Sequence, residues 1–283
     1  MRTFLIISLL LTALAGGHAA TTVDAVNRYA YGGNFGWLDW VANTNNGAVI
    51  GEYVCSGYIY SANVGWINLG SGNPANQIQY KNASTADFGV NQDGLGNLSG
   101  YAYGANIGWI TFEQTYGQPK VDLFTGKMSG YVWSANCGWI SLSNSVAYVQ
   151  TDGIQKGALD RLGLPIAWEL TYFGHTGVDP NADPDGDGMS NLQEYLAGTD
   201  PNNAASVLKI TYFSRDPAAA YNTMNWSGVS TRFYAIQTNS TLTSGVWADR
   251  VTFTTPWIIS ASWFDTTATN NFYRIRAYRP LTP

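Results

Sequence analysis

Four acidic residues with regular spacing stand in one short stretch of the chain. They are Asp183, Asp185, Asp187 and Glu194, with Gly188 directly after the third. This spacing matches the pattern D-x-[DN]-x-[DN]-G-x5-E. Three alternating carboxylates, the backbone carbonyl of Met189 and a bidentate Glu194 provide the hard oxygen ligands that Ca²⁺ prefers, and a glycine permits the sharp turn. The spacing therefore predicts a calcium-binding loop.

A solvated acidic loop without a ligand is the alternative interpretation, but random acidity does not produce this register. Carboxylates gathered in one shell repel each other by about 1 kcal/mol per pair at ~4 Å even in water. We therefore expect Ca²⁺ to act as a folding cofactor, and we expect the loop to be disordered without the ion.

Two short helices are expected to position the loop. Residues 164–173 combine apolar residues at helical spacing with Pro165 near the first turn and Gly174 after the end. Residues 191–197 form the second predicted helix. A helix, an acidic loop and a second helix are the expected context for the motif. We assign residues 151–206 to an EF-hand-like calcium-binding module.

The same region resembles thrombospondin type 3 and dockerin-like calcium repeats. The matching runs are W-E-L-T-Y-F-G, D-P-N-A-D-P-D-G-D-G, N-L-Q-E-Y and G-T-D-P. The resemblance implies that the calcium ligands are Asp183, Asp185, Asp187, Asn191 and Glu194. Such modules often begin with a first acidic loop, whereas the matching segment here, residues 158–163, retains only Asp160. Candidates to complete or share a second ion are Asp179, Asn181 and Asp200.

An internal repeat precedes the calcium module, within residues 20–150. Four segments align without gaps, and they begin at Tyr29, Tyr58, Tyr101 and Tyr131. Each segment alternates aromatic with small or apolar residues, passes through an Asn-x-Gly turn and then alternates again. This pattern predicts an antiparallel β-hairpin in every copy.

The consensus G-Y-x-[YW]-S-x-N-x-G-W-I-x-[FL] resembles a repeat of many exported bacterial proteins, and the resemblance implies no particular chemistry. Its Tyr and Trp rows have two interpretations: a stacking platform for sugar rings, or an aromatic ladder that packs the sheet through cross-strand pairs. The aromatic residues recur at identical places in every copy, as core residues do, and this recurrence favours the packing interpretation. Burial of Tyr60 and Trp66 would distinguish the two.

The two ends of the chain complete the domain plan. Residues 1–19 combine a basic start, an apolar run and small residues before the expected cleavage site, which is typical of a secretory signal peptide. Residues 207–283 contain six or seven short alternating segments, so we expect a C-terminal β-sandwich. The predicted fold class is mainly β, with an antiparallel β-hairpin repeat domain, a short helix-loop-helix calcium module and a C-terminal β-sandwich.

Composition limits the partners and the location. The chain has a net charge of −5 and its Lys and Arg residues form no basic stripe, which excludes nucleic acid as a primary partner. Outside the signal peptide, no apolar stretch approaches the length of a membrane span. We expect a protein that is secreted, attached to the cell surface or periplasmic. In such a compartment Cys55 and Cys137 form either a disulfide or two small buried hydrophobic residues.

Candidate catalytic groups are few. Once the signal peptide is removed, His175 is the one histidine, and the sequence has no G-x-S-x-G elbow. A glycosidase-type carboxylate pair would need only two acids, and the candidates are Asp39, Glu52, Glu113 and Asp122. We assign no catalytic residue and no cofactor other than Ca²⁺.

The function that we predict is that of a secreted or cell-surface, calcium-stabilised structural or adhesive protein without catalytic activity. One alternative is a carbohydrate-binding protein whose repeat Tyr and Trp residues contact extracellular polysaccharide. A second alternative is an accessory domain protein of a polysaccharide hydrolase. Other surface proteins are further candidate partners.

Overall fold

The computed structural model describes residues 20–216, 221–243, 245–253, 258–264, 272–279 and 281. The predicted signal peptide lies outside these residues. Strands make up 44% of the structure and helices 6%, which confirms the prediction of a mainly β protein with antiparallel sheets. Within the described residues, no helix has the length and apolar character needed to cross a membrane.

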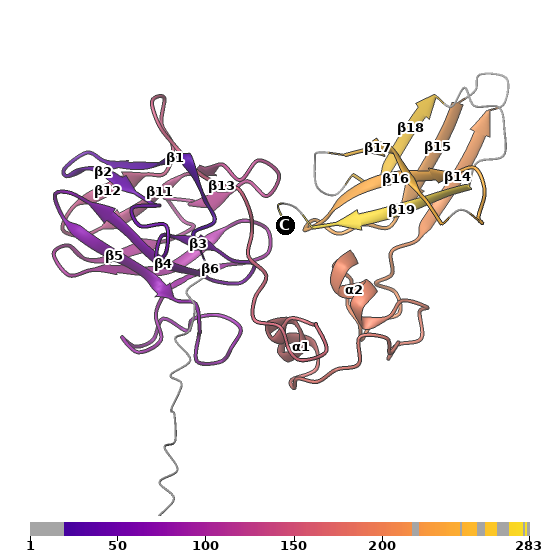
Figure 1. The fold of residues 1–283 in the computed structure, drawn as a ribbon, viewed down its shortest axis with the longest axis horizontal. Coiled ribbons are helices and arrows are strands. Elements are labelled where there is room, and N and C mark those ends of the chain that lie inside the picture. The colour runs from indigo at the N-terminus through magenta and orange to yellow at the C-terminus, as the bar shows by residue number, and fades with distance from the viewer. Residues whose placement is uncertain are drawn as a thin grey trace, which may run out of the picture.

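Four hairpins of the repeat region form a closed eight-stranded barrel (Figure 1). Their strands are β1 (Val23–Gly32) with β2 (Gly36–Asp39), β4 (Cys55–Ser61) with β5 (Gly65–Ser71), β7 (Leu98–Gly104) with β8 (Gly108–Phe112), and β11 (Tyr131–Ser134) with β12 (Gly138–Ser141). The last strand, β12, pairs with β1, where Tyr31 stands opposite Ser141. This first-to-last pairing closes the sheet and removes the edge that an open array of hairpins would expose.

Shorter strands extend the barrel at the end opposite the hairpin turns. They are β3 (Val49–Ile50) beside β4, β6 (Val90–Gln92) beside β7, and β13 (Val149–Thr151) beside β1, together with the separate pair β9 (Lys120–Val121) and β10 (Met128–Ser129). Each of the first three pairs with the beginning of a barrel strand. The segments between copies and the segment after the fourth copy therefore extend one end of the barrel.

The barrel interior is filled by small and aliphatic side chains. Because alternate residues of a strand point to opposite faces, each copy supplies one such residue from each strand. These residues are Ala30, Leu38, Ile59, Ile67, Ala102, Ile110, Val132 and Ile140, and none is more than 3% exposed. These eight positions are thus aliphatic, and the aromatic residues Phe35, Trp40 and Phe112 belong to the same buried cluster.

A ring of asparagine side chains connects the four hairpin turns. Each amide donates from Nδ2 to a backbone carbonyl in the turn of the preceding copy, at 2.7 Å to 3.1 Å. The pairs are Asn63 with Phe35, Asn106 with Val64, Asn136 with Ile107, and Asn34 with Cys137. The bond from the first copy to the last closes the ring. The glycine that follows each turn has a positive φ, for example 89° at Gly36, which other residues rarely adopt.

The two cysteines do not form a disulfide. Cys55 and Cys137 are both buried and both free thiols. Cys137 lies in a hairpin turn, whereas Cys55 begins β4, six residues before the end of that strand. The hairpin turns lie at the far end of β4 from Cys55, and six strand residues span about 20 Å. A disulfide allows a Cα separation of only up to ~7 Å. The buried-hydrophobe alternative therefore holds for both residues.

The C-terminal region contains two three-stranded sheets that share one core. One sheet consists of β14 (Ile210–Asp216), β15 (Tyr221–Trp226) and β18 (Ser260–Phe264), and the other of β17 (Ala248–Thr252), β16 (Phe233–Asn239) and β19 (Phe272–Tyr278). Met224 and Trp263 from the first sheet pack in the same buried cluster as Tyr234 and Ile236 from the second.

Two helices follow the barrel in the chain and precede the C-terminal sheets (Figure 1). Helix α1 (Ile166–Tyr172) and helix α2 (Asn191–Ala197) occupy the positions that the sequence pattern predicts. Ser190 caps α2 and forms a capping box with Gln193, and Gly198 ends the helix in the left-handed conformation. The acidic loop joins the two helices.

Candidate metal centre and aromatic belt

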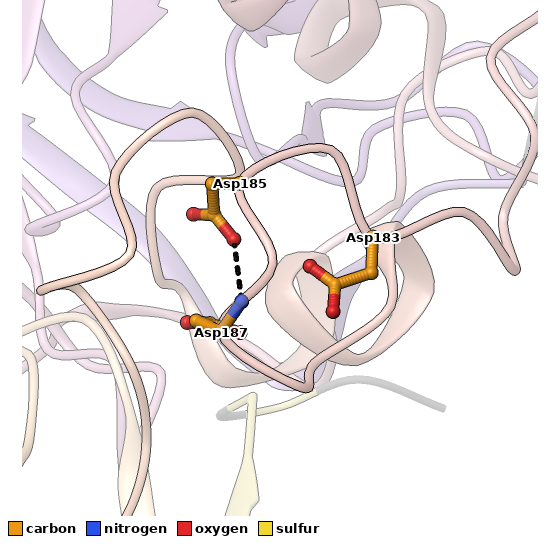
Figure 2. A group of neighbouring side chains, drawn as sticks. All are labelled: Asp183, Asp185 and Asp187. Atoms are coloured by element: carbon orange, nitrogen blue, oxygen red, sulfur yellow. Dashed lines mark hydrogen bonds between the residues drawn. The ribbon is translucent and has the colours of Figure 1, made fainter.

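The three aspartates of the acidic loop converge in space (Figure 2). One carboxylate oxygen from each of Asp183, Asp185 and Asp187 lies within 4.8 Å of the others. Asp183 accepts hydrogen bonds from the backbone N–H of Gly186 at 2.8 Å and of Gly188 at 2.9 Å. These bonds and the dashed bond from the Asp187 amide to Asp185 in Figure 2 hold the carboxylates in place although their charges repel.

Helix α2 adds two fully buried side chains to this group. Glu194 and Asn191 each have 0% of their surface exposed. Both carboxylate oxygens of Glu194 and the side-chain oxygen of Asn191 are buried without a hydrogen-bond partner in the described structure. Oδ2 of Asp185 and Oδ2 of Asp187 are also buried without a hydrogen-bond partner. A buried polar atom without a partner costs about 1 to 3 kcal/mol, so these five oxygens form a group that could hold a cation.

The charge of the loop acts directly on Glu194. Burial, followed by the negative charges of Asp185, Asp187 and Asp183, raises the pKa of Glu194 to about 7. The shift shows that the Glu194 carboxylate lies in the field of the loop although it comes from a different element. A cation at this position would reverse the shift, because it favours the ionised form.

Met189 is the remaining predicted ligand. Its backbone N–H donates to Asp187 Oδ1 at 2.7 Å, and its sulfur accepts from the Leu208 amide at 3.3 Å. Met189 therefore belongs to the loop and also contacts the start of the C-terminal region.

Asp160 and the acidic candidates for a second ion accept backbone amides of their own turns. Asp160 accepts three backbone amides of its own turn, from Leu162 to Leu164. Asp179 and Asp200 accept the amides of Asn181 and Asn202 in the same way. Among the described residues, the group around Asp183 is the one acidic cluster with metal-ligand spacing.

The acids considered for catalysis are separated and serve local structure. Asp39 pairs with Arg28 at 3.2 Å, Glu113 accepts three amides of the turn that follows it, and Asp122 accepts the amides of residues 124 and 125. Glu52 is the exception, because it forms a contact between distant parts of the chain.

Helix α2 contacts the barrel region at Glu52 and the C-terminal region at two arginines. The Tyr195 hydroxyl donates to Glu52 Oε2 at 3.2 Å, and Glu52 pairs with Arg279 at 2.5 Å. Arg232 donates to the backbone carbonyls of Leu196 at 2.8 Å and Tyr195 at 2.7 Å. Glu52 belongs to the barrel region and both arginines to the C-terminal region. One turn of α2 therefore contacts both other units. We call the group of Glu52, Tyr195, Arg232 and Arg279 the junction.

Sequence reasoning missed the junction because its members come from three units. Arg232 and Arg279 follow no motif, and the run that contains Tyr195 does not show which residues its hydroxyl contacts. Their one signal in the sequence is the presence of arginines in a chain with few charges. Burial and the neighbouring Glu52 charge raise the pKa of Tyr195 above its ordinary range, so that its hydroxyl stays protonated and can donate to Glu52.

The repeat aromatics lie on the outside of the barrel, where they form the cross-strand pairs expected of an aromatic ladder but remain partly exposed. We call them the aromatic belt: Tyr29, Tyr31, Trp37, Tyr58, Tyr60, Trp66, Tyr101, Tyr103, Trp109, Tyr131, Trp133 and Trp139. All except the half-buried Tyr29 are between 37% and 49% exposed. Because successive residues of a strand point to opposite faces, the belt aromatics face outward where their aliphatic neighbours face inward. They still pair across strands, as in the contact of 4.9 Å between the ring centroids of Tyr60 and Trp66.

Comparison with known proteins adds no assignment. No protein-family model, curated protein or solved structure matches the chain. The function must therefore be argued from the residues themselves.

Proposed function

We propose that this chain is a calcium-stabilised structural and adhesive protein of the cell exterior, without catalytic activity. In this proposal Ca²⁺ is held by Asp183, Asp185, Asp187, Asn191 and Glu194, together with the backbone carbonyl of Met189. The ion stabilises α2, and α2 keeps the barrel, the calcium module and a C-terminal β-sandwich together. Export by a cleaved signal peptide belongs to the same proposal.

The observation that supports the proposal most strongly is the position of α2. Its Asn191 and Glu194 present unpartnered buried oxygens toward the acidic loop. The next residue, Tyr195, contacts Glu52 of the barrel region and, through its backbone carbonyl, Arg232 of the C-terminal region. The same short helix thus supplies cation ligands and the contacts of the junction.

Calcium is the cation that this donor set favours. The set contains only oxygen atoms, and carboxylates with a side-chain amide suit hard cations such as Ca²⁺ rather than soft transition metals. Extracellular modules of this kind bind Ca²⁺ at about 10⁻⁴ to 10⁻³ M. A site filled at 100 times its dissociation constant stabilises the folded state by about 2.7 kcal/mol.

Thermal unfolding of the mature chain with calcium and with EDTA tests the proposal. We expect EDTA to lower the Tm and to make the segment around Asp183 sensitive to protease, and we expect added calcium to reverse both effects. Asp183→Asn should abolish the calcium response, whereas Asp122→Asn in a barrel turn should retain it. A Tm that is the same in calcium and EDTA for the unmodified chain would contradict the proposal.

A further inference from the structure

The outer face of the barrel has a recurring arrangement where two copies meet. We call each meeting line a seam. At every seam a polar residue of one copy stands directly opposite an aromatic residue of the next copy. The pairs are Asp39 with Tyr60, Asn68 with Tyr103, Thr111 with Trp133, and Ser141 with Tyr31. Residues in such register have Cβ atoms about 4.5 to 5.5 Å apart, so each seam combines a ring with a hydrogen-bonding group.

The rings of the belt are held in fixed orientations although they are exposed. Trp66 has Tyr58 on one side, with ring planes at 87°, and Tyr60 on the other, at 55°. It is nevertheless 48% exposed. The equivalent Trp139 lies between Tyr131 and Trp133 in the same way. A ring that is already ordered loses little conformational entropy when a ligand stacks on it.

The charge of the belt restricts the class of ligand. Three of the four polar seam residues are neutral: Asn68, Thr111 and Ser141. The fourth, Asp39, is paired with Arg28, the cation that lies against Tyr29. The belt therefore offers an anionic polymer no unpaired positive charge. Partly exposed rings beside hydroxyl and amide groups suit a pyranose, which has an apolar C–H face and hydroxyls at its edge.

From these observations we infer that the seams of the barrel bind neutral polysaccharide, with sugar rings stacked on belt aromatics and sugar hydroxyls bonded to the polar seam residues. This inference rests on the adhesive function proposed above and names its partner. Four related seams on one barrel can engage one polymer together, which raises avidity by about 10² to 10⁴ over a single site when the spacing permits. A polymer should therefore bind much more tightly than its free sugar units.

One copy already has a ring against its belt aromatics. Phe88, from the insertion between the second and third copies, lies edge-on to Trp109 with centroids 5.1 Å apart and also contacts Tyr103. Trp109 is the least exposed of the four equivalent tryptophans, at 41%. Phe88 thus occupies space that a sugar would use, and its removal should open the third copy.

Retention on neutral polysaccharides tests the inference. The calcium-loaded mature chain is mixed with insoluble cellulose, chitin and β-1,3-glucan, and with alginate beads as the anionic comparison. We expect retention on at least one neutral polymer, weak competition by glucose or N-acetylglucosamine, and no retention on alginate. Trp66→Ala should reduce the affinity about tenfold, whereas Phe88→Ala should increase it.

Tyr212→Ala is the matched control, because Tyr212 is an exposed aromatic residue of the C-terminal region, 52% accessible. Circular dichroism and the Tm establish that each variant is folded. The inference is overturned if the folded chain is retained on none of the neutral polymers, if it prefers alginate, or if Trp66→Ala and Tyr212→Ala bind equally. It is also overturned if sedimentation shows that the belt joins two copies of the chain. Any of these results with an intact calcium response would leave the calcium proposal standing.

Discussion

Glu194 is the residue on which the calcium proposal depends most. It is fully buried, and neither of its carboxylate oxygens has a hydrogen-bond partner in the described structure. The Asp residues of the loop have backbone amides to hold them, but Glu194 has none. Its carboxylate is therefore the group that gains most from a cation.

We expect Glu194→Gln to abolish the stabilisation by calcium. The substitution retains the shape of the side chain but removes its charge and its bidentate coordination. At a calcium concentration 100 times the dissociation constant, the lost stabilisation is about 2.7 kcal/mol. Isothermal titration calorimetry and urea unfolding measure the effect. Asp122→Asn is the control, and an unchanged calcium affinity of the Glu194 variant would remove this residue from the site.

The stability of the calcium-free protein should depend on pH through Glu194. Its pKa in the folded state is raised to about 7, above the unfolded value of about 4.3. The folded state therefore binds this proton more tightly than the unfolded chain does. The resulting stabilisation is fully present below about pH 4.3 and is lost as the pH rises through about 7.

Urea unfolding in EDTA between pH 5 and pH 8 measures this dependence. The difference in unfolding free energy between the unmodified chain and Glu194→Gln should change across that range, since glutamine does not titrate. A difference that stays constant would show that Glu194 keeps an ordinary pKa in the calcium-free protein.

The hairpins and their turns are the elements that the sequence specifies best. Alternation of period two and an Asn-x-Gly turn depend only on neighbouring residues, and all four predicted hairpins are present. Closure into a barrel could not be predicted, because the pairing of β12 with β1 joins residues about a hundred positions apart. The cross-strand pairs of the aromatic ladder could be predicted from the alternation within each copy, but the face of the closed barrel on which they lie could not.

The asparagine ring provides a test of closure. We expect Asn63→Ala to destabilise the barrel by about 1 kcal/mol, the value of one net hydrogen bond. Asn34→Ala should cost the same amount, because its bond to the Cys137 carbonyl is equivalent although it joins the first copy to the last. Denaturant unfolding compares both with Asn45→Ala in an exposed loop. A negligible cost at Asn34 together with a clear cost at Asn63 would indicate an open array rather than a closed ring.

The acidic loop and the junction differ in how far the sequence could reveal them. The spacing from Asp183 to Glu194 is contained in one continuous stretch, so the proposed ligands could be identified from the sequence. The contacts of Tyr195 with Glu52 and Arg279 bring together residues from three units. No periodicity or motif encodes such contacts, and only the folded chain shows them.

The junction connects the barrel, the helical module and the C-terminal region through side-chain contacts. Arg279 and Glu52 are largely buried, with 6% and 12% of their side chains exposed. Removal of one partner leaves the other charge buried and unpaired, which costs about 3 to 5 kcal/mol at such a site. We therefore expect Arg279→Gln to weaken the association of the C-terminal region with the barrel.

Limited proteolysis between residues 152 and 166 reports that association. Cleavage should be faster in Arg279→Gln than in the unmodified chain, while Arg215→Gln, at an exposed position of β14 outside this segment, serves as the control. Equal cleavage rates in all three proteins would mean that the Glu52–Arg279 pair does not hold the units together.

The central claim is that one calcium ion on α2 maintains the arrangement of the three units. Small-angle X-ray scattering of the mature chain, first with calcium and then with EDTA, tests this claim most directly. We expect a compact particle in calcium and a larger radius of gyration in EDTA, with full recovery when calcium is restored. Identical scattering curves, from samples in which metal analysis confirms that EDTA removed the ion, would contradict the claim.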